Sequence, residues 1–186
     1  VKTGLIYGPN SIGKSNLGKA IFDIVQTITD KERRPDLYSS YANAKHTGQP
    51  IEFVYEFVFG ASQVRYEYNK LTYEDIVDEK FFVDDIEVVS RHGNEFHTTL
   101  QGSETLNSNK LIPKISAMRF IKANASLAIN STNDIVKAFF DFVDRMLMFS
   151  NLRESLYQGF SIGGALVDVE IIKKGTVTGN NVRVRK

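Results

Sequence analysis

The sequence predicts an α/β fold, in which a strand, a glycine-rich loop and a helix are followed by an antiparallel β-meander and a helical segment. Residues Gly8 to Ser15 have the pattern G-x-x-x-x-G-K-[ST] between a strand-like run and a helix-like run. From Ile51 onward, apolar and polar residues alternate with period two in short runs separated by turns. We therefore divide the chain into a strand-loop-helix unit with its connection (1–50), a β-layer (51–102), a helical segment (103–160) and a terminal β-hairpin (161–186).

The composition is that of a core-forming protein, with 186 residues of which 42% are hydrophobic and 24% charged. The 23 basic and 22 acidic residues give a net charge of +1, which argues against a protein that coats nucleic acid. The absence of cysteine excludes a disulfide scaffold, thiolate metal sites and a cysteine nucleophile. No apolar run has the length of a membrane span and no secretory signal is present, so we expect a cytoplasmic protein without a membrane partner.

The segment that carries chemistry is the loop between the strand-like run Gly4–Tyr7 and a helix with apolar residues at three- and four-residue spacing. Gly8 and Gly13 permit backbone torsions that turn successive N–H groups inward around a phosphate. A helix beginning near Lys14 adds its N-terminal dipole to the same anion. We expect Lys14 to be the catalytic cation on the β- and γ-phosphates and Ser15 to be the Mg²⁺ ligand. The predicted nucleotide-binding residues are Gly8, Pro9, Asn10, Ser11, Ile12, Gly13, Lys14, Ser15 and Asn16. The alternative is a strand-to-helix turn that binds nothing.

The run Gly8-Pro9-Asn10, followed by Gly13-Lys14-Ser15-Asn16, resembles the loop of ABC-type ATPases of the chromosome-maintenance, recombination-repair and OLD-like classes. It is most similar to AAA-family ATP-binding proteins allied to OLD. The resemblance implies the amino-terminal lobe of an ABC-ATPase-like P-loop NTPase with an inserted antiparallel β-meander. It also implies Mg²⁺–ATP binding, hydrolysis in the complete homodimer, and a nuclease or phage-defence effector acting on nucleic acid.

Such ATPases also need a Walker B aspartate, an adjacent catalytic glutamate and a signature loop, none of which we identify in this sequence. We expect these parts beyond residue 186, and a chain cut at both ends, since it opens at Val1 close to the loop. A non-catalytic nucleotide-sensing module is the alternative function. A phosphotransferase using Arg145 and Arg153 is a third possibility.

The predicted β-layer begins with Ile51–Phe59, whose odd positions are all large and apolar, and it turns at Gly60–Ser62. Further strands are predicted to follow, with a turn at His92–Asn94; they are Val64–Tyr68, Lys80–Val83, Glu87–Ser90 and Glu95–Leu100. Parallel neighbours need crossovers of a dozen or more residues, so these short connections predict antiparallel pairing.

Helices are predicted over Leu111–Ala123 and Asn133–Phe149, with a capping region at Asn130–Asn133 and a polar loop at Ser103–Ser108. In the second helix an apolar stripe predicts a core face; its residues are Ile135, Phe139, Phe142, Val143, Met146 and Leu147. A final hairpin is predicted from Val167–Lys173 and Val182–Arg185, turning at Gly179–Asn181.

Three other patterns have two interpretations each. Asp84-Asp85 after an apolar run resembles a Walker B site, but its place inside the meander favours a hairpin turn. The group His92, Glu95 and His97 could share a metal, but surface residues are the simpler interpretation. Arg33-Arg34 could touch nucleic acid, although such a charge run is typical of a solvated helix end. We also interpret Phe160–Gly164 as a glycine-rich turn rather than a signature loop.

Overall fold

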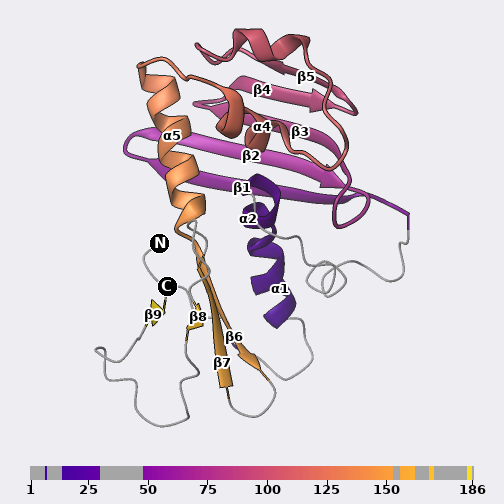
Figure 1. Ribbon diagram of the computed structural model, residues 1–186, viewed down its shortest axis with the longest axis vertical. Helices are drawn as coiled ribbons and strands as arrows, with labels where there is room; N and C mark the ends of the chain where they lie inside the picture. Colours follow the sequence, from indigo (N-terminus) through magenta and orange to yellow (C-terminus); the bar gives the residue numbers. More distant parts are fainter. Residues whose placement is uncertain are drawn as a thin grey trace.

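The computed structural model (Figure 1) describes Tyr7 and residues 14–29, 48–152, 156–161, 168–169 and 184–185. For residues 14–15 and those from 147 onward it describes only the secondary structure. The largest unit is a five-stranded antiparallel sheet in which each strand pairs with the next in the sequence. Its strands are β1 (Ile51–Phe59), β2 (Ser62–Lys70), β3 (Ile76–Val83), β4 (Ile86–His92) and β5 (Glu95–Thr98).

The meander predicted from period-two alternation is confirmed, with short hairpins between successive strands. The β3–β4 turn is the Asp84-Asp85 pair, and both residues have positive φ, 50° and 62°. Two-residue turns with positive φ match the twist of antiparallel strands, and aspartate tolerates this conformation better than most residues. The interpretation of Asp84-Asp85 as a turn is therefore confirmed.

Helices pack against one face of this sheet (Figure 1), while on the opposite face Val54 and Val58 of β1 are 53% and 70% exposed. The helical elements are α1 (Lys14–Ile21), α2 (Asp23–Ile28), the 3₁₀ helix η1 (Glu104–Ser108), α4 (Ala117–Asn124) and α5 (Ser131–Asp144). The core lies between these helices and the sheet. Its centre is aromatic, since the rings of Phe81 and Phe139 lie 4.8 Å apart and Tyr66 is fully buried beside them.

The predicted α/β class, a P-loop NTPase lobe with a parallel sheet and an inserted meander, is wrong for the described residues. All of their strand pairs are antiparallel, including β6 with β7 and β8 with β9. The physical reason is chain length, because hairpins of a few residues cannot make the crossover that parallel neighbours require. The meander is the main body of the described part, with helices packed on one face, and not an addition to a parallel sheet.

Both predicted helix ranges were partly wrong at their ends. Residues 111–116 are not helical, because α4 begins only after Ser116, whose hydroxyl accepts a hydrogen bond from the Arg119 N–H at 2.9 Å. The predicted cap of the next helix is confirmed, since the Asn130 side chain accepts from the Asn133 N–H at 2.8 Å. That helix ends at Asp144; Arg145 and Met146 lie between the two elements, and the predicted helical residues 147–149 belong instead to β6.

Strand β6 (Leu147–Leu152) pairs with β7 (Leu156–Ser161), a hairpin that the sequence analysis did not predict. In the terminal segment, β8 (Asp168–Val169) pairs antiparallel with β9 (Val184–Arg185). This pairing agrees with the predicted final hairpin. Its predicted turn at Gly179–Asn181 and the glycines of the predicted 160–164 turn lie outside the described residues.

Candidate functional site

The candidate phosphate-binding loop leads into α1. Residues Gly8 to Gly13 and the arginines Arg33-Arg34 lie outside the described residues. Helix α1 begins at Lys14, so the lysine and serine of the motif are its first two residues, and Asn16 is its third and half-buried. The first four N–H groups of an α-helix have no carbonyl partner within the helix, and they carry its positive dipole end. The end of the motif therefore coincides with the anion-binding end of a helix.

The predicted strand before the loop has one described residue, Tyr7. This residue lies in no strand and is 86% exposed. The strand-loop-helix context is thus described only on its helical side.

The predicted single helix after the loop is two helices that meet at Phe22. The Phe22 N–H donates to the Gly18 carbonyl at 3.1 Å and closes the last turn of α1. Helix α2 is buried along its whole length. In contrast, Leu17 and Ile21 on α1 are each 46% exposed, so the predicted apolar face is core only in its second half. In Figure 1, α2 overlaps the sheet and α1 extends beyond the edge strand β1.

A buried polar cluster ties α2 to strand β2. The Asp23 oxygen Oδ2 accepts hydrogen bonds from the Tyr68 hydroxyl at 2.7 Å, from Lys70 Nζ at 2.7 Å and from the Thr27 hydroxyl at 3.1 Å. The side chains of Lys70 and Asp23 are 0% and 3% exposed, which makes this a fully buried ion pair. We call Asp23, Thr27, Tyr68 and Lys70 the Asp23 anchor. Beside it, the Tyr55 hydroxyl donates to the Ala20 carbonyl of α1 at 2.9 Å.

The tyrosines at this cluster act as hydrogen-bond donors. Burial raises the pKa of Tyr68 well above its ordinary value, and the nearby Asp23 charge raises it further. Burial likewise raises the pKa of Tyr55. Both hydroxyls therefore keep their protons at neutral pH, so each can donate to the oxygen of α1 or α2 that faces it.

The Asp23 anchor was not predicted from the sequence, although β2 carries a signal for it. The buried positions of that strand are Val64, Tyr66, Tyr68 and Lys70, so a lysine stands where the period-two pattern requires an inward side chain. A buried lysine needs a charged partner, and the pattern therefore predicts a buried acid on whatever covers this face.

A second buried carboxylate caps α4. Glu79 on β3 accepts hydrogen bonds from the backbone N–H groups of Ala117 at 2.6 Å and Met118 at 3.0 Å, and from the Tyr66 hydroxyl at 2.9 Å. Burial raises the pKa of Glu79, while these three donors lower it by a smaller amount. Here the carboxylate holds a helix N-terminus, which is a structural role.

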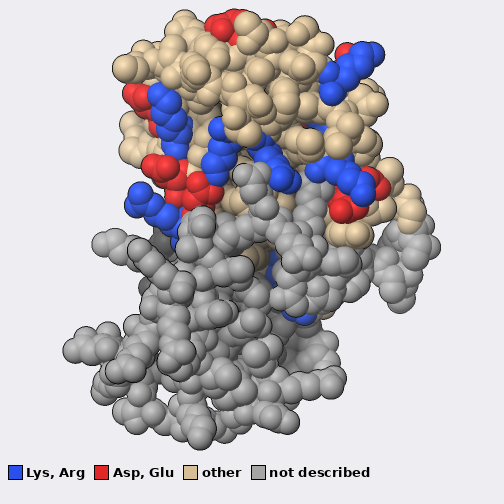
Figure 2. All heavy atoms as spheres, viewed as in Figure 1, with Lys and Arg blue, Asp and Glu red and all other residues tan. Residues whose placement is uncertain are grey.

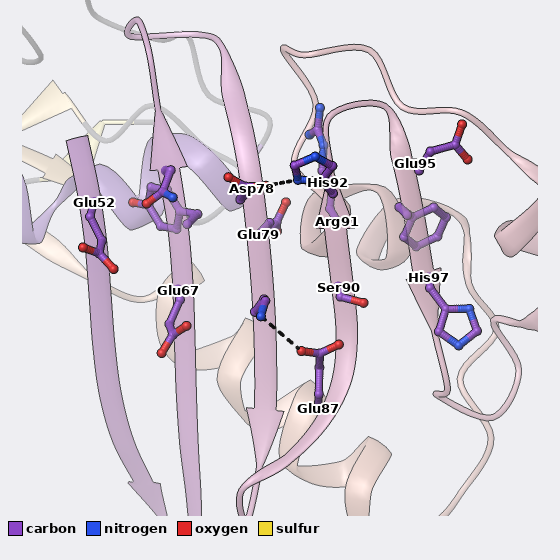
Figure 3. Close-up of a pocket in the computed structure, with 14 residues that line it drawn as sticks. Glu52, Glu67, Asp78, Glu79, Glu87, Ser90, Arg91, His92, Glu95 and His97 are labelled. Atoms are coloured by element: carbon purple, nitrogen blue, oxygen red, sulfur yellow. Dashed lines mark hydrogen bonds and ion pairs between the residues drawn. The ribbon is translucent and has the colours of Figure 1, made fainter. Parts of the chain in front are cut away.

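The face of the sheet opposite the helices carries a groove of about 840 Å³, drawn in Figure 3. Its polar side chains include two cross-strand pairs, His92 with Asp78 at 2.5 Å and Lys80 with Glu87 at 3.8 Å. The other lining residues are Glu52, Glu67, Tyr68, Asn69, Glu79, Ser90, Arg91, Glu95, Phe96 and His97. Within the described ranges, no three histidine or acidic side chains lie close enough to hold a metal ion. The three residues His92, Glu95 and His97, considered above as possible metal ligands, belong to the described ranges and do not form such a group.

Charged side chains of both signs are interspersed on the face shown in Figure 2. On this face, basic and acidic groups stand next to one another over the described part. A surface that binds nucleic acid electrostatically presents clustered Lys and Arg instead. Among the described residues, no helix has the length and apolar character needed to cross a membrane.

Comparison with known proteins gives no significant match: no family model, no curated protein and no solved structure matches the chain.

Proposed function

We propose that the chain binds Mg²⁺–ATP through residues Gly8 to Asn16. One observation carries this proposal: α1 begins at Lys14, the lysine of the motif G-x-x-x-x-G-K-[ST]. Helix N-termini preceded by such glycine-rich loops bind phosphate because their N–H groups and dipole favour negative charge.

Each residue of the motif has a role in this proposal. The loop amides and the Lys14 ammonium bind the β- and γ-phosphates and stabilise the charge of the transferred phosphoryl group. The Ser15 hydroxyl is the Mg²⁺ ligand, and Asn16 completes the cradle. Mg²⁺ supplies charge neutralisation on the same oxygens when it is bound.

The complete protein, in this proposal, is a cytoplasmic OLD-like ATPase. It hydrolyses ATP in a site completed by a second copy of the chain, and it drives a nuclease or defence effector that acts on nucleic acid. The support is the motif and its position at the start of α1. The absence of cysteine fits a reducing compartment.

A nucleotide-sensing module without turnover is the second candidate function. It is favoured by the use of Asp23 and Glu79, the buried carboxylates among the described residues, as acceptors that fix helices. A carboxylate engaged in this way is not available to orient a water molecule.

Calorimetric titration with Mg²⁺–ATP and Mg²⁺–GTP tests the proposal, with Lys14→Ala as the matched variant. We expect saturable binding of ATP by the wild-type chain and a loss of binding in Lys14→Ala with an unchanged circular dichroism spectrum. Ser15→Ala should retain metal-free binding and lose the gain that Mg²⁺ gives. A folded wild-type chain that binds neither nucleotide contradicts the proposal.

A further inference from the structure

We propose that the Asp23 anchor positions the nucleotide-binding helix, so that Tyr68 and Lys70 of β2 tune the affinity for Mg²⁺–ATP without touching the nucleotide. This inference rests on the proposed function. It concerns positioning residues, since none of the anchor's side chains belongs to the loop.

The anchor lies at the far end of the helix from the phosphate site. Asp23 follows Phe22, whose N–H closes the last turn of α1, so the anchor fixes the C-terminal end of α1. Lys14 stands at the other end, about 12 Å away for eight residues at 1.5 Å each. A tilt of about 5° at the anchor moves Lys14 by about 1 Å, a displacement that matters to charge positioning at a reacting centre.

The hydrogen bonds of the Asp23 anchor fix the orientation of the helices relative to the sheet. One donor to Asp23 Oδ2 comes from α2 itself, the Thr27 hydroxyl, while Tyr68 and Lys70 reach it from β2. The Tyr55 hydroxyl adds a bond from β1 to the Ala20 carbonyl, one residue before the end of α1. Apolar burial of α2 alone has no directional preference, whereas these bonds fix the orientation of the helix pair.

The exposed apolar residues of α1 support the same conclusion. Leu17 and Ile21 are each 46% exposed, so packing on this helix is incomplete. An incompletely packed helix depends on its fixed end for its direction. Tyr68 and Lys70 are buried, at 1% and 0% exposure, and provide such an end.

The test compares two tyrosines of one strand that differ in what they hold. Tyr68→Phe removes a donor to Asp23, while Tyr66→Phe removes a donor to Glu79 and so loosens α4. Both hydroxyls are buried and both bond a carboxylate, at 2.7 and 2.9 Å, so the two variants should lose similar stability. Only the first should affect the nucleotide site.

The measurement is the Kd of each folded variant for Mg²⁺–ATP by calorimetry, together with amide hydrogen exchange. We expect Tyr68→Phe to raise the Kd by about three- to tenfold, which corresponds to part of the free energy of a hydrogen bond to a charged group. We expect the Kd of Tyr66→Phe to stay within about twofold of the wild-type value. Exchange should quicken in residues 16–28 for Tyr68→Phe and in Ala117–Asn124 for Tyr66→Phe.

Tyr55→Phe provides a second variant at a less buried position, since it removes the bond to Ala20 and leaves the Asp23–Lys70 pair in place. It should also weaken binding. If the wild-type chain binds Mg²⁺–ATP and both Tyr68→Phe and Tyr55→Phe bind it as tightly as the wild type, the positioning role is refuted while the proposed function stands. Equal weakening by Tyr66→Phe refutes it too, because a general loss of stability then explains the effect. Failure of the wild-type chain to bind overturns the proposed function and this inference with it.

Discussion

Replacing Lys70 with methionine isolates the charge of the buried ion pair. The two side chains are similar in length, so Lys70→Met retains most of the apolar packing and removes the ammonium. Lys70 Nζ lies 2.7 Å from Asp23 Oδ2, and the lysine side chain is 0% exposed. In the variant, the Asp23 carboxylate stays buried without its lysine partner.

We expect Lys70→Met to lower the free energy of unfolding by about 3–5 kcal/mol, the cost of removing one partner of a buried pair. The Tyr68 and Thr27 hydroxyls still donate to the carboxylate, which favours the lower end of that range. A small domain has a total stability of about 5–15 kcal/mol, so this loss is a large fraction. The double variant Asp23→Asn, Lys70→Met removes both charges, and it should recover most of the loss.

Urea unfolding followed by circular dichroism at pH 7 measures the free energy of unfolding of the single and the double variant, provided that its slope with urea concentration is unchanged. The exposed pair Lys110–Glu95, with both side chains 75% exposed, gives a matched control. Lys110→Met should change stability by less than about 1 kcal/mol, as surface ion pairs do. A Lys70→Met effect as small as the control's refutes the argument, and so does a double variant less stable than the single one.

Three further predictions concern the turn, a tight loop contact and the second buried carboxylate. Asp85→Gly should raise the free energy of unfolding by about 0.5–1 kcal/mol, because Asp85 has φ of 62° and glycine adopts it without strain. Gly102→Ala should lower it by about 2 kcal/mol or more in the same urea assay, since a Cβ there would lie 2.1 Å from the Ser126 carbonyl oxygen at φ of 88°. The raised pKa of Glu79 means that the folded state binds the proton of this carboxyl more tightly than the unfolded state does. The contribution of Glu79 to the free energy of unfolding is therefore complete below pH 4.5, the ordinary pKa, and falls as the pH rises through the folded pKa. Glu79→Gln should abolish that decline, and an unchanged pH profile would contradict the assignment.

The meander could be predicted because its signals are local. The alternation of apolar and polar residues in Ile51–Phe59 indicates a strand with one buried face. The adjacent residues Asp84-Asp85 indicate a hairpin turn. Pairing then follows from chain length, since neighbours along the chain have only short connections. The fold class was wrong because it was inferred from the loop motif, which describes a strand-to-helix turn and carries no information on the sheet beside it.

The start of α4 is set by the local cap at Ser116 together with contacts that are distant in the sequence. Residues 111–115 are apolar enough to continue a helix, yet their backbone groups bond elsewhere: the Leu111 N–H donates to the Asn94 carbonyl and the Pro113 carbonyl accepts from the Ile76 N–H. The Arg91 guanidinium of β4 donates hydrogen bonds to the Ile112 and Ile115 carbonyls. Such tertiary hydrogen bonds override local helix propensity, and no window of sequence contains them.

The helices on this sheet have fixed directions because buried charged groups interrupt an otherwise apolar core, among them the carboxylates of Glu79 and Asp23. Tyr66 and Tyr68 project from the same face of β2, and each donates to a buried carboxylate, Glu79 for the first and Asp23 for the second. An aromatic face alone lets helices settle at several angles with similar buried area, because apolar burial is not directional. Each carboxylate costs desolvation free energy, and that cost is offset only when its donors lie within bonding distance. Strand β3 thereby fixes α4 through Glu79, and strand β2 fixes the helix pair that carries Lys14 through Tyr68 and Lys70, which is why we expect the sheet to influence the proposed phosphate site.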